Sequence, residues 1–577
     1  MSNLINTAMS GLKAAQAALS TVSNNISNQA VTGYSRQNAL IEQAMGTKTS
    51  AGYIGNGVNL VSINRDYNEF ISNQLRSAQA TSSSVSANYE QISKIDNLLA
   101  NSTTNLSSTI QAFFTNLQNL ANNADDSATR QTMLGKAEGL VNQFKVTDKY
   151  LGDMNSNINT QVDSIVGQVN TYSSQIANLN KEITRLLGAN QGAVPNDLYD
   201  QRDLLVDKLN TLVGVDVTVQ DGTLYHVSLK NGLSLVQGMN SAELEAIPSS
   251  GDPARTTVGY KDAVIGTIEI AENTISGGSL SGLLSFRSGT LDNTRNQIGQ
   301  LALAFADAFN TQHKAGFDFT GEPGGDFFKI GSPTVLNNAK NTGDAVLTAA
   351  FTDSKAVQAT DYKLEFNGTN WNVTRLSTNT TLGSMTPDAD GKLSFEGLEV
   401  TVAGTAPQKG DSFILKPVKD VIVDMDVAIT DANKIAAASF KLDENGNRVQ
   451  KVDGNGSPVV DADGNPVYEF GGPKDNTNAK ALLALQNTKV VEGKSTLSGA
   501  YAGLVGQIGN ETNTLKINNT SQVNVVKQLT IEQQSVSGVN LDEEYGDLMR
   551  FQQYYMANAQ VIQTAQALFD ALLSIRS

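Results

Sequence analysis

The chain has 577 residues, of which 40% are hydrophobic, 17% are charged and none is cysteine, and its formal net charge is −16. This length implies several domains, and the absence of cysteine excludes disulfides, thiol nucleophiles and cysteine-ligated metal centres. The negative charge and the lack of a basic patch argue against nucleic-acid binding, which needs clustered Lys and Arg.

The N-terminal segment predicts an amphipathic helix. Its apolar residues recur every seven positions at Ile5, Leu12, Leu19 and Ile26, with Ala8, Ala15 and Val22 three residues after the first three. This spacing is typical of a narrow coiled-coil seam. The segment has neither a basic start nor a continuous apolar run, so it does not resemble a cleaved signal peptide. No part of the sequence predicts a membrane-spanning helix, and we expect no membrane insertion.

The C-terminal segment repeats the pattern. Leu541, Leu548, Tyr555, Ile562 and Phe569 recur every seven positions, accompanied by Phe551, Ala565 and Leu572. Lys13 is the only charged residue before Arg36, and no charge occurs between Arg550 and Asp570. An ordinary pair of terminal helices packed on a globular core is one interpretation. The weak charge favours burial on several sides, as in a polymer.

Between these ends, helical and β-like segments alternate. Helical periodicity runs from about 65 to 210, and Gly214 is a plausible helix stop before a β segment to about 272. A helix returns around 285–315 and ends near Gly316. Residues 361–376 predict a hairpin about Asn367-Gly368. Three Asx/Gly turns within 443–466 predict exposed hairpin tips, and helix resumes from Thr477.

The predicted fold class is an α+β multidomain protein, in which discontinuous N- and C-terminal helices form a coiled-coil or helical-bundle stem and β-rich domains are inserted in the middle. Residues 1–35 and 545–577 are the predicted terminal helices. A discontinuous helical domain is assigned to 36–211, 274–330 and 475–544, and β-rich outer domains to 212–273 and 331–474.

Few residues suggest chemistry. His226 and His313 lack the neighbours of a metal site or a catalytic triad, and His313 is expected near a helix end, where the dipole favours a cation. The turn at 461–465 imitates the start of a calcium loop but lacks its later ligands, so we interpret it as a solvated turn. The glycines of 52–57 predict a loop or twisted hairpin rather than a phosphate loop. The acidic cluster 542–544 complements the dipole of the last helix. We predict no enzyme activity, no cofactor and no metal site.

Both ends resemble the flagellar axial proteins, a family of rod, hook and hook-associated subunits. Residues 23–37, SNNISNQAVTGYSRQ, resemble the family's Asn-rich signature, and residues 537–575 resemble its closing segment. Ser35-Arg36-Gln37 follow Gly33-Tyr34 where hook and rod subunits usually have lysine, which favours the hook-associated members. Ala30-Val31-Thr32 replace the Asn-Thr-Pro of many relatives, so the local turn can differ.

The resemblance implies a structural subunit at the junction between hook and filament. It implies that the terminal helices are disordered in the monomer and pair into an inner tube on assembly, with Ile5, Leu12, Leu19, Ile26, Leu548, Phe551, Tyr555, Ile562, Phe569 and Leu572 in the assembly interface. The implied partners are further copies in a helical ring, the hook protein, the third hook-associated protein and an export chaperone on the C-terminal helix. It also implies an extracellular location in the flagellum, reached by type III export without a cleaved signal peptide.

Three alternatives stay open. The chain could be a surface adhesin whose β insert binds a ligand, or another axial subunit of the hook or rod. A peptidoglycan hydrolase is the third alternative, although no catalytic constellation supports it.

Overall fold

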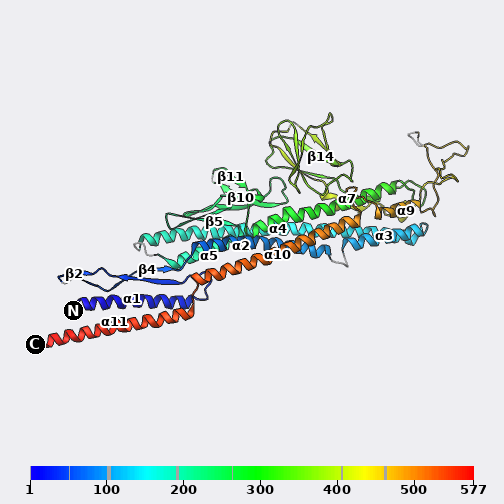
Figure 1. The fold of residues 1–577 in the computed structure, drawn as a ribbon. Helices are drawn as coiled ribbons and strands as arrows, with labels where there is room; N and C mark the ends of the chain where they lie inside the picture. Colours follow the sequence, from blue (N-terminus) through cyan, green and yellow to red (C-terminus); the bar gives the residue numbers. More distant parts are fainter. Residues whose placement is uncertain are drawn as a thin grey trace.

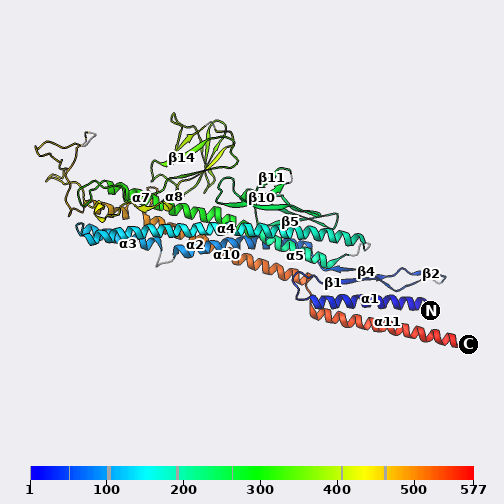
Figure 2. The ribbon, with the colours of Figure 1, turned by 180° about the vertical axis from the view of Figure 1, so that it is seen from behind.

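The computed structural model describes residues 2–50, 52–100, 105–189, 194–262, 264–404, 407–460, 464 and 466–576. The molecule is elongated, with both termini at one end and the β-rich parts projecting from one side of a helical stem (Figures 1 and 2). Across the described residues, no helix is both long and apolar enough to cross a membrane.

The stem is built around one long helix, α4 (Ser127–Ala189), whose 63 residues correspond to about 95 Å. Leu151, Ile158 and Ile165 recur every seven residues and are buried, so α4 presents one apolar stripe along most of its length. The other stem helices are α2 (Glu69–Ala100), α3 (Leu106–Asn122), α5 (Asn196–Leu212), α6 (Gly278–Phe286), α7 (Asp292–Lys314), α9 (Thr477–Ala484) and α10 (Leu497–Ser537).

Aromatic residues hold the stem together where α3 meets α7. The ring of Phe113 lies edge-on to those of Phe305 and Phe309, at centroid distances of 5.3 and 5.5 Å. Phe328, in the short strand β12 (Phe328–Lys329), closes the same cluster. β12 pairs with β21 (Asp426–Val427) beside α8 (Lys419–Val423). Short 3-10 helices lie at Glu272–Thr274, Ala432–Lys434 and Leu485–Asn487, and a short π-helix at Arg287–Leu291 joins α6 to α7.

The first β-rich part packs on α4. One antiparallel sheet has the order β5-β6-β7-β8 and a second has the order β11-β10-β9. Amide side chains of α4 bind the strand backbones, since Asn170 both donates to and accepts from Leu244 at 2.8 Å. The strands are β5 (Val215–Gln220), β6 (Leu224–Leu229), β7 (Ser234–Gln237), β8 (Asn240–Ser241), β9 (Glu243–Pro248), β10 (Thr256–Asp262) and β11 (Gly266–Glu269).

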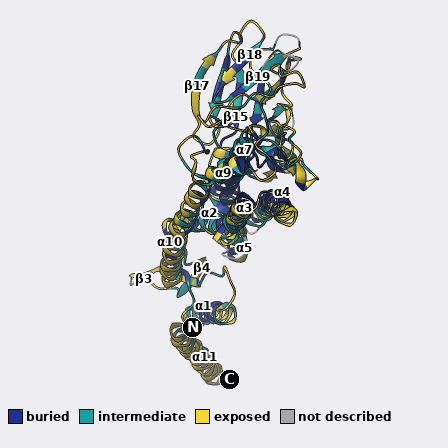
Figure 3. Cartoon of the chain, turned by 90° about the vertical axis from the view of Figure 1, so that its right-hand side faces the viewer, coloured by how far each residue is buried: buried dark blue, intermediate teal, exposed yellow. Residues whose placement is uncertain are grey.

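The second β-rich part stands further out and contains the predicted hairpin at Asn367-Gly368 (Figure 3). Its sheets have the orders β13-β20-β15-β16-β17 and β14-β19-β18. Its first strand pairs with its last, with Thr334 opposite Lys416, so the chain enters and leaves side by side. The strands are β13 (Thr334–Asn337), β14 (Val346–Phe351), β15 (Tyr362–Phe366), β16 (Trp371–Arg375), β17 (Thr380–Met385), β18 (Lys392–Phe395), β19 (Leu398–Ala403) and β20 (Ser412–Lys416).

Residues 439–460 and 466–470 form an arm of short hairpins at the end of the stem far from the termini (Figure 1). Asp443 and Asp453 each accept hydrogen bonds from backbone N–H groups of their own turns, which confirms the first two predicted turns. Most of the third turn, at 461–465, lies outside the described residues.

The opposite end of the molecule carries a terminal unit of two helices and a ribbon, in which α1 (Ser2–Asn28) lies between the ribbon and α11 (Leu541–Arg576) (Figures 1 to 3). The ribbon pairs β1 (Gln37–Gln43) with β4 (Val58–Arg65), and β2 (Thr47–Thr49) with β3 (Gly52–Ile54) near its tip. It lies within the range 36–211 assigned to the helical domain. Gly52 and Gly57 adopt positive φ angles, which explains why their segment turns rather than continues as helix.

Candidate assembly interface

The two terminal helices pack as an antiparallel pair. Next to the stem, the side-chain amide of Asn25 donates to Glu544 Oε2 at 3.0 Å. Two seven-residue repeats further out on both helices, Gly11 faces Asn558, and a Cβ at position 11 would lie 2.6 Å from Asn558 Oδ1. The two contacts define a single register, and glycine at position 11 permits the close approach.

Small side chains make the buried face of α1. Ala8, Ala15 and Val22 of the predicted pattern are buried, as are Ala14 and Ala18. On α11, only Glu544 and Ala565 are buried among the residues described. Since burial free energy scales with apolar area, small side chains contribute little each. The pair therefore buries modest apolar area within one copy.

The structure places the predicted interface residues on this pair. Half-buried positions are Ile5, Leu12, Leu19 and Ile26 on α1, and Leu548, Phe551 and Ile562 on α11. Tyr555 and Phe569 are 37% and 50% exposed. Leu572 lies in α11, but its side chain is outside the described part of the structure. The apolar seams predicted at the two ends of the chain thus lie on one pair of packed helices. Part of the C-terminal seam is exposed at the surface of this pair.

Beyond the seam, α11 exposes further large apolar side chains, namely Tyr545, Met549, Tyr554, Met556, Val561, Leu568 and Leu573. A helix that is apolar around most of its circumference is normally buried on several sides. The helix carries no charge between Arg550 and Asp570. Its surface is therefore unlike that of a solvated terminal helix.

The Asn-rich signature folds into a polar clamp at the base of the pair, formed by Asn25, Tyr34, Arg36 and Glu544. Asn25 Oδ1 accepts from the Tyr34 hydroxyl at 2.8 Å and from the backbone N–H of Gln37 at 3.0 Å. Burial, followed by the charges of Asp200 and Glu544, raises the pKa of Tyr34 to about 12. The phenol therefore stays protonated, and remains a hydrogen-bond donor, well into the alkaline range.

Arg36 connects the clamp to the first turn of α11. Its Nε donates to Glu544 Oε1 at 2.7 Å, and its Nη1 donates to Glu543 Oε2 at 2.9 Å. Burial alone would lower the pKa of Arg36, but the hydrogen bond to Glu544 and the charges of both glutamates raise it overall. The Glu544 side chain is 1% exposed, whereas that of Glu543 is 58% exposed. Glu544 is therefore the buried counter-charge.

A second ionic network fastens the clamp to the stem. The backbone N–H of Ser35 donates to Asp200 Oδ2 at 3.0 Å, and Arg65 pairs with Asp200 and Asp203 at 2.9 and 2.6 Å. Asp203 also binds Arg76 of α2 at 3.1 Å. Burial raises the pKa of Asp200 despite these partners, while the two aspartates raise that of Arg65 against its own burial. Ribbon, clamp, α5 and α2 thus meet in one buried polar cluster.

Sequence reasoning missed these clamp and network residues. It assigned the acidic cluster 542–544 to the dipole of the last helix, without a partner for Glu544. The available signal was Arg36, the first charge after a nearly charge-free helix, which required a counter-charge somewhere in the fold. Its partner lies 508 residues away in the chain, and sequence spacing carries no information about such a distant pair.

The residues considered for other chemistry have structural surroundings. His313 is buried; its Nδ1 lies 2.8 Å from the Gly325 carbonyl oxygen, and its Nε2 accepts from the N–H of Ala436 at 2.8 Å. Burial lowers its pKa, so the expectation of a cation favoured by the helix dipole was wrong. Gly52 and Gly57 lie in the ribbon, in agreement with the predicted hairpin.

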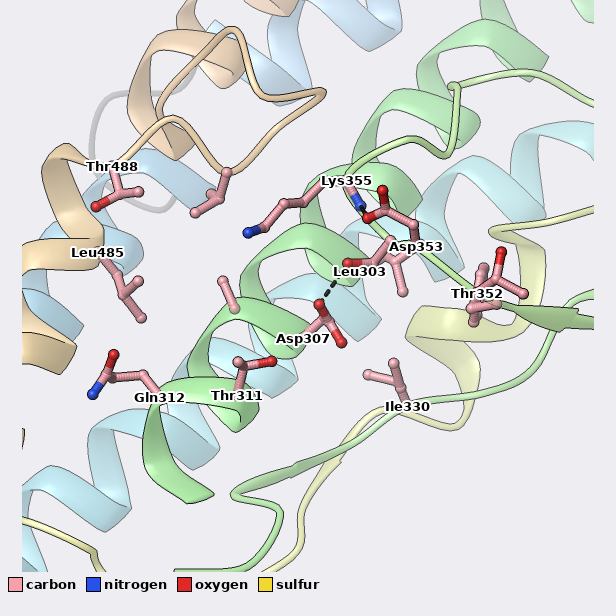
Figure 4. A pocket seen from close by; sticks show the side chains of 14 residues that line it. Leu303, Asp307, Thr311, Gln312, Ile330, Thr352, Asp353, Lys355, Leu485 and Thr488 are labelled. Atoms are coloured by element: carbon pink, nitrogen blue, oxygen red, sulfur yellow. Dashed lines mark hydrogen bonds between the residues drawn. The ribbon is translucent and has the colours of Figure 1, made fainter. Parts of the chain in front are cut away.

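A cavity of about 410 Å³ lies between α7, β14 and the segment after α9, away from the terminal unit (Figure 4). Asp307 on its floor accepts a hydrogen bond from Ser354 at 2.5 Å, and Asp353 and Lys355 lie at its rim. Within the described ranges, no three His, Cys, Asp or Glu side chains are grouped to hold a metal ion.

The two ends of the chain match models of flagellar rod proteins. Residues 5–34 match "Flagella basal body rod protein", and residues 533–575 match "Flagellar basal body rod FlgEFG protein C-terminal". Paired terminal helices at one end of a long stem, with these matches, define a flagellar axial protein. The middle is more specific: residues 92–328 match the helical domain of flagellar hook-associated protein FlgK, and residues 336–417 match a D2-like domain of flagellar hook-associated protein 1.

Full-length relatives agree with this class. The chain is 57% identical to flagellar hook-associated protein 1 of Salmonella typhimurium and 55% identical to that of Escherichia coli, over the whole of both chains in each case. A solved structure, the flagellar hook junction protein FlgK from Burkholderia pseudomallei, matches with a TM-score of 0.73 at 31% identity. The match covers 81% of this chain and 100% of the Burkholderia pseudomallei chain. The chain belongs to the family of flagellar hook-associated protein 1.

Family membership confirms the predicted resemblance, the fold class and the role of a structural subunit at the hook–filament junction. The family consists of structural proteins of the bacterial flagellum, which places the chain in that organelle and among axial proteins that adjoin the hook.

Proposed function

We propose that the pair of α1 and α11 is the polymerising element of this junction subunit, and that it forms the axial core of a helical ring with other copies. The observation that carries the proposal is the surface of α11, where Tyr555 and Phe569 are exposed on a stretch without charge. An exposed apolar surface of this kind marks a contact with other chains. In the same step, the half-buried apolar residues of α1 would become fully buried, namely Ile5, Leu12, Leu19 and Ile26.

The clamp fixes the orientation of the stem relative to this axial core. Asn25, Arg36 and Glu544 hold the base of the pair, while Asp200 holds the clamp on the stem. Because the ionic groups are paired and mostly buried, they fix geometry more than they add stability. The stem and outer domains would therefore project from the axial core at a defined angle.

The junction position requires different neighbours on its two sides. We expect the hook protein on one side and the third hook-associated protein on the other, because a heterologous contact presents different surfaces at its two ends. An export chaperone would cover the apolar stripe of α11 before assembly, as grooves do for amphipathic helices. The subunit would reach its extracellular position by type III export without removal of a signal peptide.

The test places one charge in the seam of the full-length chain. Ile562→Asp or Leu12→Asp should leave the stem folded but abolish incorporation, because burying an unpaired carboxylate costs several kcal/mol, roughly. The control is Asn142→Asp, which adds the same charge at an exposed position of α4, away from the terminal unit. Each variant is produced in cells that lack the native chain, and electron microscopy counts hooks that carry a filament.

Circular dichroism of the purified variants establishes that the stem is folded. Normal filament attachment by both seam variants would contradict the proposal, whereas loss with the seam variants and retention with Asn142→Asp supports it.

A further inference from the structure

The surface of α1 turned away from α11 carries a groove that the fold leaves open. One part, of about 450 Å³, lies between α1 and β4 and is lined by Met9, Lys13, Val58 and Leu60. A second, shallow hollow of about 490 Å³ lies further along the same helix and is lined by α1 alone, at residues that include Ser20 and Ser27. The groove is anchored, since Ser10 of α1 accepts a hydrogen bond from the N–H of Val58 at 3.1 Å.

Both this groove and the outer side of α11 follow seven-residue rows. On α1, Asn6, Lys13, Ser20 and Ser27 form the row in the groove. On α11, Met549, Met556, Gln563 and Asp570 form an exposed row, away from the column of Glu544, Asn558 and Ala565 on the helix surface. Each row spans three heptads, so the two have equal length and period.

Each row contains one charge, and the two charges have opposite sign. Lys13 is the only charge of α1, and Asp570 is the only charge of α11 between Arg550 and Arg576. Neither forms a salt bridge with any residue that the structure describes. A charge that becomes buried on assembly needs a counter-charge, because an isolated buried ion is costly.

The register excludes this pairing within one copy. The contacts of Gly11 with Asn558 and of Asn25 with Glu544 place Lys13 level with Met556. Asp570 lies two heptads further along, a displacement of about 21 Å. The pair can therefore form only between copies.

We propose that the groove formed by α1 and β4 receives the outer row of α11 from a neighbouring copy, with Lys13 of one copy paired to Asp570 of the next. This inference rests on the proposed function and names the surfaces through which copies stack. All copies of an axial polymer share one orientation, so the incoming α11 runs antiparallel to α1. Gln563 then lies opposite Ser20, and Met556 lies opposite Ser27.

The stacking contact is heterologous, since the groove is lined by α1 and β4 whereas the incoming row lies on the face of α11 away from its contacts with Gly11 and Asn25. Heterologous contacts repeat without self-pairing and generate open helical arrays or rings. The charge-free remainder of both rows allows close packing without further unpaired ions.

Disulfide mapping tests the register, because the native chain contains no cysteine. Full-length Lys13→Cys/Asp570→Cys and Ser20→Cys/Gln563→Cys variants are assembled in cells lacking the native chain, and isolated flagella are oxidised. Both should give ladders of cross-linked multimers on non-reducing gels, since a disulfide needs Cα atoms within about 7 Å. Lys13→Cys/Gln563→Cys, one heptad out of register, should give none, and neither should any single-cysteine chain.

Charge reversal gives a second, independent measurement. Lys13→Glu and Asp570→Lys should each reduce the number of filament-bearing hooks at least tenfold, and the double variant should recover most of them. Lys181→Glu, at an exposed position of α4, is the matched control and should have no effect.

Incorporated double-cysteine chains without a ladder, or a double reversal no better than its single variants, would overturn the pairing. These results would leave the proposed function intact, which fails only if the seam variants Ile562→Asp and Leu12→Asp attach filaments normally.

Discussion

Glu544 shows how one buried carboxylate organises two chain ends that sequence order keeps apart. It accepts hydrogen bonds from Asn25 and Arg36 and is almost fully buried. Removing one partner of a buried charged hydrogen bond costs more than the bond contributes net, because the remaining group loses both water and protein partners. The residue therefore contributes mainly to the position of α11 relative to the stem.

We expect Glu544→Gln to loosen the base of the terminal pair. The half-buried guanidinium of Arg36 would keep only Glu543 at 2.9 Å and Asp547 at 3.8 Å as charged partners, and the cost should be about 1.5–3 kcal/mol. Amide hydrogen exchange across residues 25–37 should become faster. Glu543→Gln, which changes an exposed partner, should cost under about 1 kcal/mol. Equal effects of the two substitutions would contradict the assignment of Glu544 as the main counter-charge.

His313 predicts a specific pH dependence of stability. Burial lowers its pKa below the usual value of 6.5, so at acid pH the unfolded chain takes up a proton more readily than the folded one. Stability should therefore fall as pH drops below 6.5, with a slope of up to about 1.4 kcal/mol per pH unit. Urea unfolding at a series of pH values between 5 and 7.5 measures the free energy of unfolding and hence this slope. His313→Gln should remove this component of the slope; an unchanged slope would show that other groups dominate.

At the scale of elements, the heptad pattern predicted α1 and α11 correctly, because seven-residue spacing places residues on one helical face whatever the partner. General helical periodicity over 65–210 predicted helix where α4 lies, although not its seven-residue stripe, and turn chemistry predicted the hairpin at Asn367-Gly368. The ribbon at 37–65 was assigned to a helical range because β1 and β4 have no buried position, so no buried face marks them as strands. Only the glycines of 52–57 signalled a turn.

Hydrogen exchange on the purified monomer should separate the terminal pair from the stem. The pair buries mainly Ala side chains, whereas α4 buries a stripe with Leu151 and Ile158. We expect fast exchange over residues 2–24 and 550–576, slow exchange in α4, and strong protection of both ends only in assembled flagella. Protection of both ends in the monomer would instead indicate a finished helical bundle and would reopen the adhesin interpretation.

At the scale of the whole molecule, each part is joined to the next by a polar contact that sequence patterns do not reveal. The outer β domain is linked to the first β-rich part through Lys416 and Asp252 at 2.5 Å, and through Lys340 and Glu269 at 3.0 Å. Hydrophobic periodicity and turn residues identify the helical and β-rich parts from sequence, because both signals depend on residues that are close together in the chain. The joints depend on single pairs far apart in the chain, and these had to come from the structure.

The entry and exit of the outer domain allow a decisive deletion. Thr334 and Lys416 are paired neighbours on adjacent strands, which lie about 5 Å apart, so a Gly-Ser-Gly link can replace residues 335–415 while keeping Lys416 beside Asp252. We expect this variant to be incorporated and to support filament attachment, because the proposed polymerising element lies at the other end of the stem. Filament-bearing hooks are counted by electron microscopy. Loss of attachment with a folded stem would show that the outer domain itself makes an essential contact, and would transfer the search for partner surfaces to its exposed strands.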